Sequence, residues 1–152
     1  MKALTLHQQA SLLKLRFPKA KPRFEKFGKN ELLEFDLSLQ PTPTSAAYRV
    51  RFLYAVGARP LVVVMNPQPV REAHGMPTPH LNADWTLCLY DPNNDEWSSS
   101  DPLVYTIVQW TMRWLFHYEH WLTFGEWKGD QPPPPVALPD AGATGSPAEV
   151  AA

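Results

Sequence analysis

The spacing of hydrophobic and polar positions changes along the chain and predicts a short helix, three strands and a longer second helix. Near the N-terminus, leucines punctuate a polar background, which predicts an amphipathic helix that ends at Phe17, before Pro18. Residues 32–40 (LLEFDLSLQ) and 47–56 (AYRVRFLYAV) alternate apolar and polar side chains, as half-buried strands do. Residues 60–66 (PLVVVMN) form a β-branched run that suits a strand buried on both faces. Short connections between the three strands favour an antiparallel meander.

Two segments between these elements lack a clear period. Residues 19–30 (KAKPRFEKFGKN) are basic and irregular, and we expect a connecting loop there. Residues 67–100 are also irregular, but their tryptophan, tyrosine and leucine content argues against disorder. Irregular segments of this length inside a compact domain usually carry function. The only cysteine of the chain, Cys88, lies in this segment.

The second helix is marked at both ends. Asp101 is a suitable N-cap, Pro102 suits the first turn, and Gly125 is a suitable C-terminal stop. Between them, apolar side chains recur at helical spacing in two neighbouring stripes, so most of this helix must be covered. The remaining narrow face is lined by Gln109, Arg113 and His120.

These elements predict an α+β domain over residues 1–129. Residues 130–152 are rich in proline and alanine and contain no aromatic or basic side chain, so we expect a disordered tail. At 152 residues the chain has the length of one domain.

Composition narrows the cellular setting. The net charge of -1 gives no electrostatic reason to expect nucleic acid or a membrane surface as a partner. The N-terminus lacks the long apolar run of a signal peptide. The apolar stretch 103–124 includes arginine, glutamate and histidine, which a lipid-facing span would not accommodate cheaply. One cysteine cannot form an internal disulfide, so we expect a cytoplasmic protein.

The residues around Cys88 leave several chemistries open. Free cysteines are most often buried and inert, and the flanking Leu87 and Leu89 fit that interpretation, whereas the irregular loop favours a reactive thiol. His74, His80 and Cys88 could ligate zinc, but no CxxC is present, and we predict no metal. A cysteine hydrolase would need one of these histidines as its base. No glycine-rich phosphate loop occurs, so we predict no nucleotide cofactor.

A family resemblance bears on this choice. The segment HLNADWTLCLYDP (residues 80–92) is followed by Glu-Trp and by TIVQWTMRWLFHYEHWLTFGEWKG (residues 106–129). This order resembles the bacterial ubiquitin-conjugating enzyme-like proteins, which have the ubiquitin-conjugating (UBC-like) fold. In that family a histidine-containing loop leads into Leu-Cys-Leu-Tyr, and a tryptophan-rich helix ends in Gly-x-Trp. The likeness in sequence covers residues 79–129. For residues 1–66 only the order of the predicted elements, a helix followed by a meander, agrees with the family. Trp85 stands where bacterial relatives tend to have glycine.

The resemblance implies a catalytic role for Cys88. The cysteine would accept the C-terminal carboxyl of a modifier or substrate protein as a thioester and pass it to an amine. His80 falls at the position of the family's loop histidine. The eukaryotic relatives have His-Pro-Asn there, and Asn82 is the matching candidate for stabilising the oxyanion. Asp91, Asp95 and Glu96 lie just downstream and are the candidates to orient the amine, and Asp91 is the nearest in the sequence.

The same resemblance suggests a biological setting. Standalone bacterial proteins of this kind are similar to those of short CBASS anti-phage systems, where the conjugating protein acts on the C-terminus of a cGAS-like cyclase. The expected partners are therefore that C-terminus and a separate activating enzyme. Two alternatives stay open, a catalytically silent UBC-like scaffold and a thiol hydrolase or zinc protein on a related frame.

Overall fold

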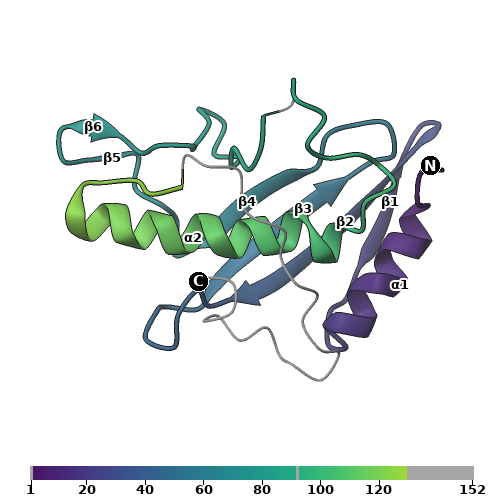
Figure 1. The fold of residues 1–152 in the computed structure, drawn as a ribbon. Helices are drawn as coiled ribbons and strands as arrows, with labels where there is room; N and C mark the ends of the chain where they lie inside the picture. Colours follow the sequence, from purple (N-terminus) through teal and green to yellow (C-terminus); the bar gives the residue numbers. More distant parts are fainter. Residues whose placement is uncertain (1, 92, 130–152) are drawn as a thin grey trace.

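The computed structural model describes residues 2–91 and 93–129, which form the predicted α+β architecture (Figure 1). Its centre is an antiparallel sheet in the strand order β1-β2-β3-β4. Neighbours in the sequence are therefore neighbours in the sheet, which confirms the predicted meander. The strands are β1 (Arg23–Phe27), β2 (Asn30–Leu39), β3 (Tyr48–Tyr54) and β4 (Leu61–Asn66).

The N-terminal helix α1 (Leu6–Arg16) confirms the prediction from leucine spacing. Its first turn is closed by a capping box, because the Thr5 hydroxyl accepts the Gln8 N–H at 3.0 Å and the Gln8 side chain accepts the Thr5 N–H at 2.9 Å. The helix ends at Phe17, directly before Pro18, whose ring cannot continue a helix.

The expectation of a loop over residues 19–30 is wrong, because β1 lies within it. Gly28 has φ +62°, which permits the tight turn that pairs Phe27 with Asn30. β1 is an edge strand with four of its five residues exposed, so it buries no apolar face and shows no alternating pattern. The sheet therefore has four strands rather than three.

The core lies between one face of the sheet and α2 (Ile107–Phe124), which crosses that face (Figure 1). Alternate residues of β2 and β3 point into this core, as the period of two predicted. The buried set from these strands is Leu33, Phe35, Leu37, Leu39, Tyr48, Val50, Phe52 and Tyr54.

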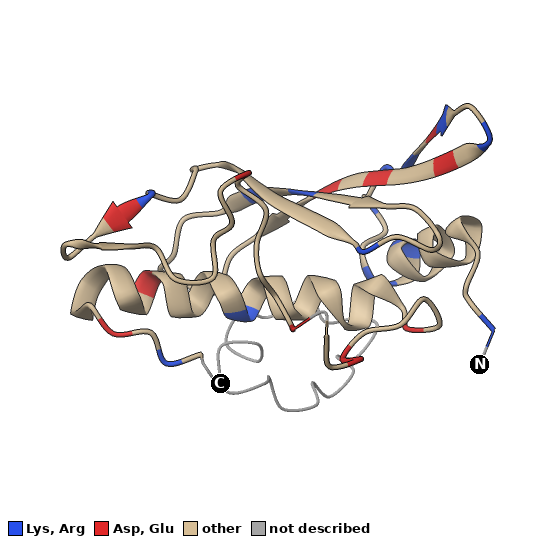
Figure 2. Cartoon of the chain, turned by 90° about the horizontal axis from the view of Figure 1, so that it is seen from above, with Lys and Arg blue, Asp and Glu red and all other residues tan. Residues whose placement is uncertain are grey.

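Charged residues alternate with the buried positions of β2 and β3 and so lie on the opposite face of the sheet. Figure 2 marks the charged residues of the strands as red and blue bands. Arg51 donates to both carboxylate oxygens of Asp36, at 2.9 and 3.1 Å, and Arg23 pairs with Glu34 at 2.6 Å. The hydrogen bond from Arg51 lowers the pKa of Asp36.

The predicted start of the second helix is wrong by one turn. A short 3-10 turn, η1 (Leu103–Tyr105), comes first, and α2 begins at Ile107. The Asp101 carboxylate accepts the Ser98 N–H at 2.9 Å and so does not cap α2. Pro102 has ψ 126° and is extended, which delays the helix.

Contacts with α1 explain this delay. The buried Gln9 side chain accepts the Leu103 N–H at 2.8 Å and donates to the Asp101 carbonyl at 3.0 Å, so the helix start is fixed against α1. The predicted stop at Gly125 is confirmed, with φ +73° and its N–H donating to the Trp121 carbonyl. Gln109 is only 3% exposed, so its assignment to the narrow polar face is wrong.

The long irregular segment contains one small hairpin, made of β5 (Glu72–Ala73) and β6 (Met76–Pro77). It packs on the end of α2, where His74 Nε2 lies 2.9 Å from the Leu122 carbonyl. None of the helices in the described ranges is long and apolar enough to cross a membrane. The tail predicted over residues 130–152 lies outside the described residues.

Candidate active site

Cys88 closes a hairpin-like loop formed by residues 80–88, here called the cysteine hairpin. The Cys88 N–H donates to the His80 carbonyl at 3.0 Å, and the Asn82 N–H donates to the Thr86 carbonyl at 2.9 Å. These two bonds bring the predicted residues His80 and Cys88 together through their backbones. The loop is thus ordered although the sequence shows no strand period there.

Two other elements hold the base of the cysteine hairpin. The Leu87 N–H donates to the Val62 carbonyl of β4 at 2.9 Å. The His80 carbonyl also accepts the indole N–H of Trp114, on α2, at 2.9 Å. Trp114 is 4% exposed, so the indole N–H forms this bond inside the core. The backbone of Cys88 is therefore fixed between the sheet and α2.

Cys88 is half-buried. Cys88 Sγ lies 3.8 Å from the Tyr90 carbonyl, a weak contact of the S–H with an acceptor. The Tyr90 ring packs against Trp110 with 5.7 Å between centroids, and burial raises the pKa of the Tyr90 hydroxyl. A cysteine that is only half-buried can react with an acyl group while its backbone stays fixed.

His80 is exposed and has φ +55°, a left-handed conformation that costs a non-glycine residue on the order of 1 kcal/mol. Its ring lies 5.2 Å from the ring of Trp127, which in turn lies 5.5 Å from Trp114. The His80 ring is thus linked through Trp127 to Trp114, whose indole N–H bonds the His80 carbonyl.

The other two predicted site residues make hydrogen bonds within their own loops. The Asn82 amide donates to the Thr86 hydroxyl at 3.1 Å, across the cysteine hairpin. The exposed Asp91 carboxylate accepts the Asn93 N–H and the Asn94 amide, each at 2.9 Å. Both residues lie near Cys88 in the sequence, and in the structure their side chains form hydrogen bonds within their own loops.

The turn of the cysteine hairpin is also held by a charged side chain. The Thr86 hydroxyl donates to the Asp84 carboxylate at 2.6 Å, and this hydrogen bond lowers the pKa of Asp84. The Thr86 N–H donates to the same oxygen at 3.1 Å.

Sequence reasoning missed two residues of this site. Trp114 appeared only as a core residue, although a buried indole N–H needs an acceptor and so signals a specific contact. Arg71 reaches the turn of the cysteine hairpin from another loop, and its side chain donates to the Asn82 and Ala83 carbonyls. No signal in the sequence pointed to Arg71, because it lies in an irregular segment and is exposed.

Metal ligands do not converge in the part of the chain that the structure describes. No group of three histidine, cysteine, aspartate or glutamate side chains there could hold a metal ion. His74 packs its ring on Trp121 at the end of α2, at 5.6 Å, whereas His80 packs on Trp127.

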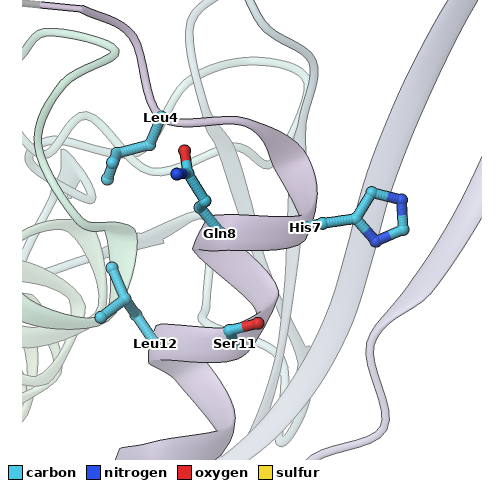
Figure 3. A pocket seen from close by; sticks show the side chains of 5 residues that line it. All are labelled: Leu4, His7, Gln8, Ser11 and Leu12. Carbon is cyan, nitrogen blue, oxygen red and sulfur yellow. The ribbon is translucent and has the colours of Figure 1, made fainter.

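An open hollow of about 380 Å³ lies on α1 (Figure 3). Its lining comes from the N-terminal segment and α1, and none of it belongs to the cysteine hairpin. The hollow is therefore not the place where Cys88 would meet a substrate. The lining residues are Leu4, His7, Gln8, Ser11 and Leu12.

Comparison with known proteins identifies one family. A family model described as Type II CBASS E2 protein matches residues 9–134. The match includes all four strands of the sheet, the cysteine hairpin and α2. None of the curated proteins compared with the chain matches it.

Proposed function

The chain belongs to the Type II CBASS E2 protein family, and from this premise we propose that Cys88 carries an acyl group as a thioester. The acyl group would come from the C-terminal carboxyl of a CBASS partner protein, such as a cGAS-like cyclase, and would pass to an amine. We also propose that the helix, antiparallel meander, cysteine loop and long helix form a UBC-like fold.

The reaction has two steps. In the first, Cys88 Sγ attacks the carbonyl carbon of an activated C-terminus; a C–S bond forms, the activating group leaves and the thiol proton passes to a base. In the second, an amine attacks the thioester carbon; a C–N bond forms, the C–S bond breaks, the amine nitrogen gives up one proton and the sulfur takes up one. Activation of the carboxyl is assigned to a separate activating enzyme.

We assign the supporting roles to the residues named from the resemblance. His80, whose backbone carbonyl accepts the Cys88 N–H, is the candidate base, and Asp91 is the candidate to orient the incoming amine. Asn82 is the candidate oxyanion donor, for which its amide must leave the Thr86 hydroxyl.

The single observation that supports this proposal most directly is the position of Cys88. The only thiol of the chain is half-buried, and the hairpin that carries it is tied to β4 and α2. An inert core cysteine needs neither this exposure nor these anchors.

The test is co-expression of the chain with its neighbouring CBASS genes, comparing wild type with Cys88→Ser and Cys88→Ala. We expect a reductant-sensitive adduct on the wild type in non-reducing gels, and its added mass identifies the partner. Cys88→Ser is expected to form an oxygen ester that resists reductant, and Cys88→Ala to form no adduct.

The same strains test the alternative of a silent scaffold. If no adduct forms in any strain, and Cys88→Ala protects cells from phage as well as the wild type does, the thioester proposal is wrong. Hydrolysis of a model thioester by wild type, without any transfer to protein, would instead support a thiol hydrolase.

A further inference from the structure

We propose that Arg71 is a positioning residue for Cys88, acting through the turn of the cysteine hairpin. The inference rests on the proposed function, because positioning matters only if Cys88 reacts. It adds a residue that the resemblance did not suggest.

The Arg71 guanidinium makes three contacts with this turn. Its two terminal nitrogens donate to successive carbonyl oxygens, Nη1 to Asn82 at 3.1 Å and Nη2 to Ala83 at 2.6 Å. Its central carbon lies 3.6 Å from the centroid of the Trp85 ring, in cation–π geometry. A planar, forked donor that also stacks on an aromatic ring is a combination that lysine cannot reproduce.

The turn needs such a brace because its backbone is unusual. Trp85 has φ +73°, a left-handed conformation that is unfavourable for a bulky side chain and that persists only where surrounding contacts hold it. The Trp85 N–H donates to the Asn82 carbonyl, which also accepts from Arg71. Arg71 therefore contacts both ends of the strained turn.

The backbone of Arg71 is itself well fixed. The Val70 N–H donates to the Tyr118 hydroxyl on α2 at 2.9 Å, and the Thr78 N–H donates to the Arg71 carbonyl at 2.9 Å. The brace thus connects α2 to the tip of the cysteine hairpin, whereas Trp114 connects α2 to its base. Together the two ties hold the hairpin at both ends against one rigid helix.

Removing the contacts of Arg71 with the tip should let the cysteine hairpin move around its base. A displacement of about 1 Å at a reacting group can slow a reaction strongly, because the attacking atom leaves the line of approach. We therefore expect slower acyl transfer to a thiol that has become more accessible.

The variants are Arg71→Gln, Arg71→Lys and Trp85→Leu, with Arg49→Gln as the matched control. Arg49 is also exposed but lies on β3, outside the cysteine hairpin. Three quantities are measured in the full chain: amide exchange at Asn82 and Trp85 by NMR, alkylation of Cys88 by iodoacetamide, and the rate of adduct formation with the CBASS partner. Cys88 is the only cysteine, so alkylation reports on this thiol alone.

For Arg71→Gln we expect amide exchange about tenfold faster and alkylation about threefold faster, with adduct formation about tenfold slower. Trp85→Leu should change all three quantities in the same direction as Arg71→Gln. The values for Arg71→Lys should lie between those of the wild type and Arg71→Gln, and Arg49→Gln should match the wild type. Opposite changes in alkylation and adduct formation distinguish positioning from a general loss of fold, which thermal unfolding of each variant checks.

Unchanged amide exchange and alkylation in Arg71→Gln would overturn the inference, as would faster exchange with an unaltered rate of adduct formation. If the wild type forms no adduct while alkylation still rises in Arg71→Gln, the proposed function fails and the control of Cys88 by Arg71 stands.

Discussion

The two sides of Cys88 are held in different ways. On the N-terminal side, residues 80–87 bond to β4, to α2 and to Arg71. On the C-terminal side, the hydrogen bonds of Asp91 stay within residues 91–96. The backbone on the N-terminal side is thus bonded to the framework, whereas on the C-terminal side the Tyr90 ring packs on Trp110 and the polar groups of Asp91 bond within their own loop. Substitutions that remove the bonds of residues 80–87 should therefore lower the free energy of unfolding. Substitution of Asp91 should change the rate of acyl transfer and leave the free energy of unfolding nearly unchanged.

The sharpest test of this contrast is Trp114→Phe. The change keeps a ring in the core but removes the N–H that bonds the His80 carbonyl, and it leaves a small void. We expect a loss of about 2 kcal/mol in the free energy of unfolding, measured in urea. Trp110→Phe is the control, because Trp110 is only half-buried and should lose less than about 1 kcal/mol. Equal losses in the two variants would contradict a special role for Trp114.

A smaller effect is expected from acid on the turn of the cysteine hairpin. The hydrogen bond from Thr86 lowers the pKa of Asp84, so the carboxylate binds its proton less readily in the folded chain than in the unfolded chain. Its contribution to stability is present above the ordinary pKa of 3.8 and is lost as the pH falls through the lower pKa of the folded chain. NMR titration of the Asp84 carboxyl should give a midpoint below 3.8.

Thr86→Val is the control for this titration, because valine keeps the shape of threonine and removes the hydroxyl donor. The Asp84 midpoint should then rise toward its ordinary value. A midpoint that stays low in Thr86→Val would show that another group causes the shift.

The smallest effect on stability is expected for Asp91→Asn, on the other side of Cys88. Asp91 is exposed, and among the described residues its carboxylate bonds Asn93 and Asn94 of its own loop, so the free energy of unfolding should change by less than about 0.5 kcal/mol. If Asp91 orients the amine, discharge of the adduct to lysine should slow while loading of Cys88 stays at the wild-type rate. A large loss of stability would break the contrast between the two sides.

The helix α1 and the strands β2 and β3 were predictable because buried apolar residues recur at regular spacing along them. The alternation from Leu33 to Leu39 and from Tyr48 to Tyr54 follows from one buried sheet face, and the leucines of α1 follow from one buried helix face. β1 was missed for the same reason, since an exposed edge strand has no buried face to encode. The start of α2 was missed because Gln9, far away in the sequence, takes the Leu103 N–H.

For the candidate site, the sequence by itself identified Cys88 and His80 through their residue types, the long irregular loop and the family resemblance, and the family match agrees with that resemblance. The groups that hold the cysteine hairpin became identifiable from their contacts in the folded chain. Trp114 and Arg71 lie 26 and 17 residues from Cys88 in the sequence, and both reach the hairpin by hydrogen bonds to backbone carbonyls, one from Trp114 and two from Arg71. Every residue has the same backbone carbonyl, so the sequence does not show which carbonyl a distant side-chain donor will bond.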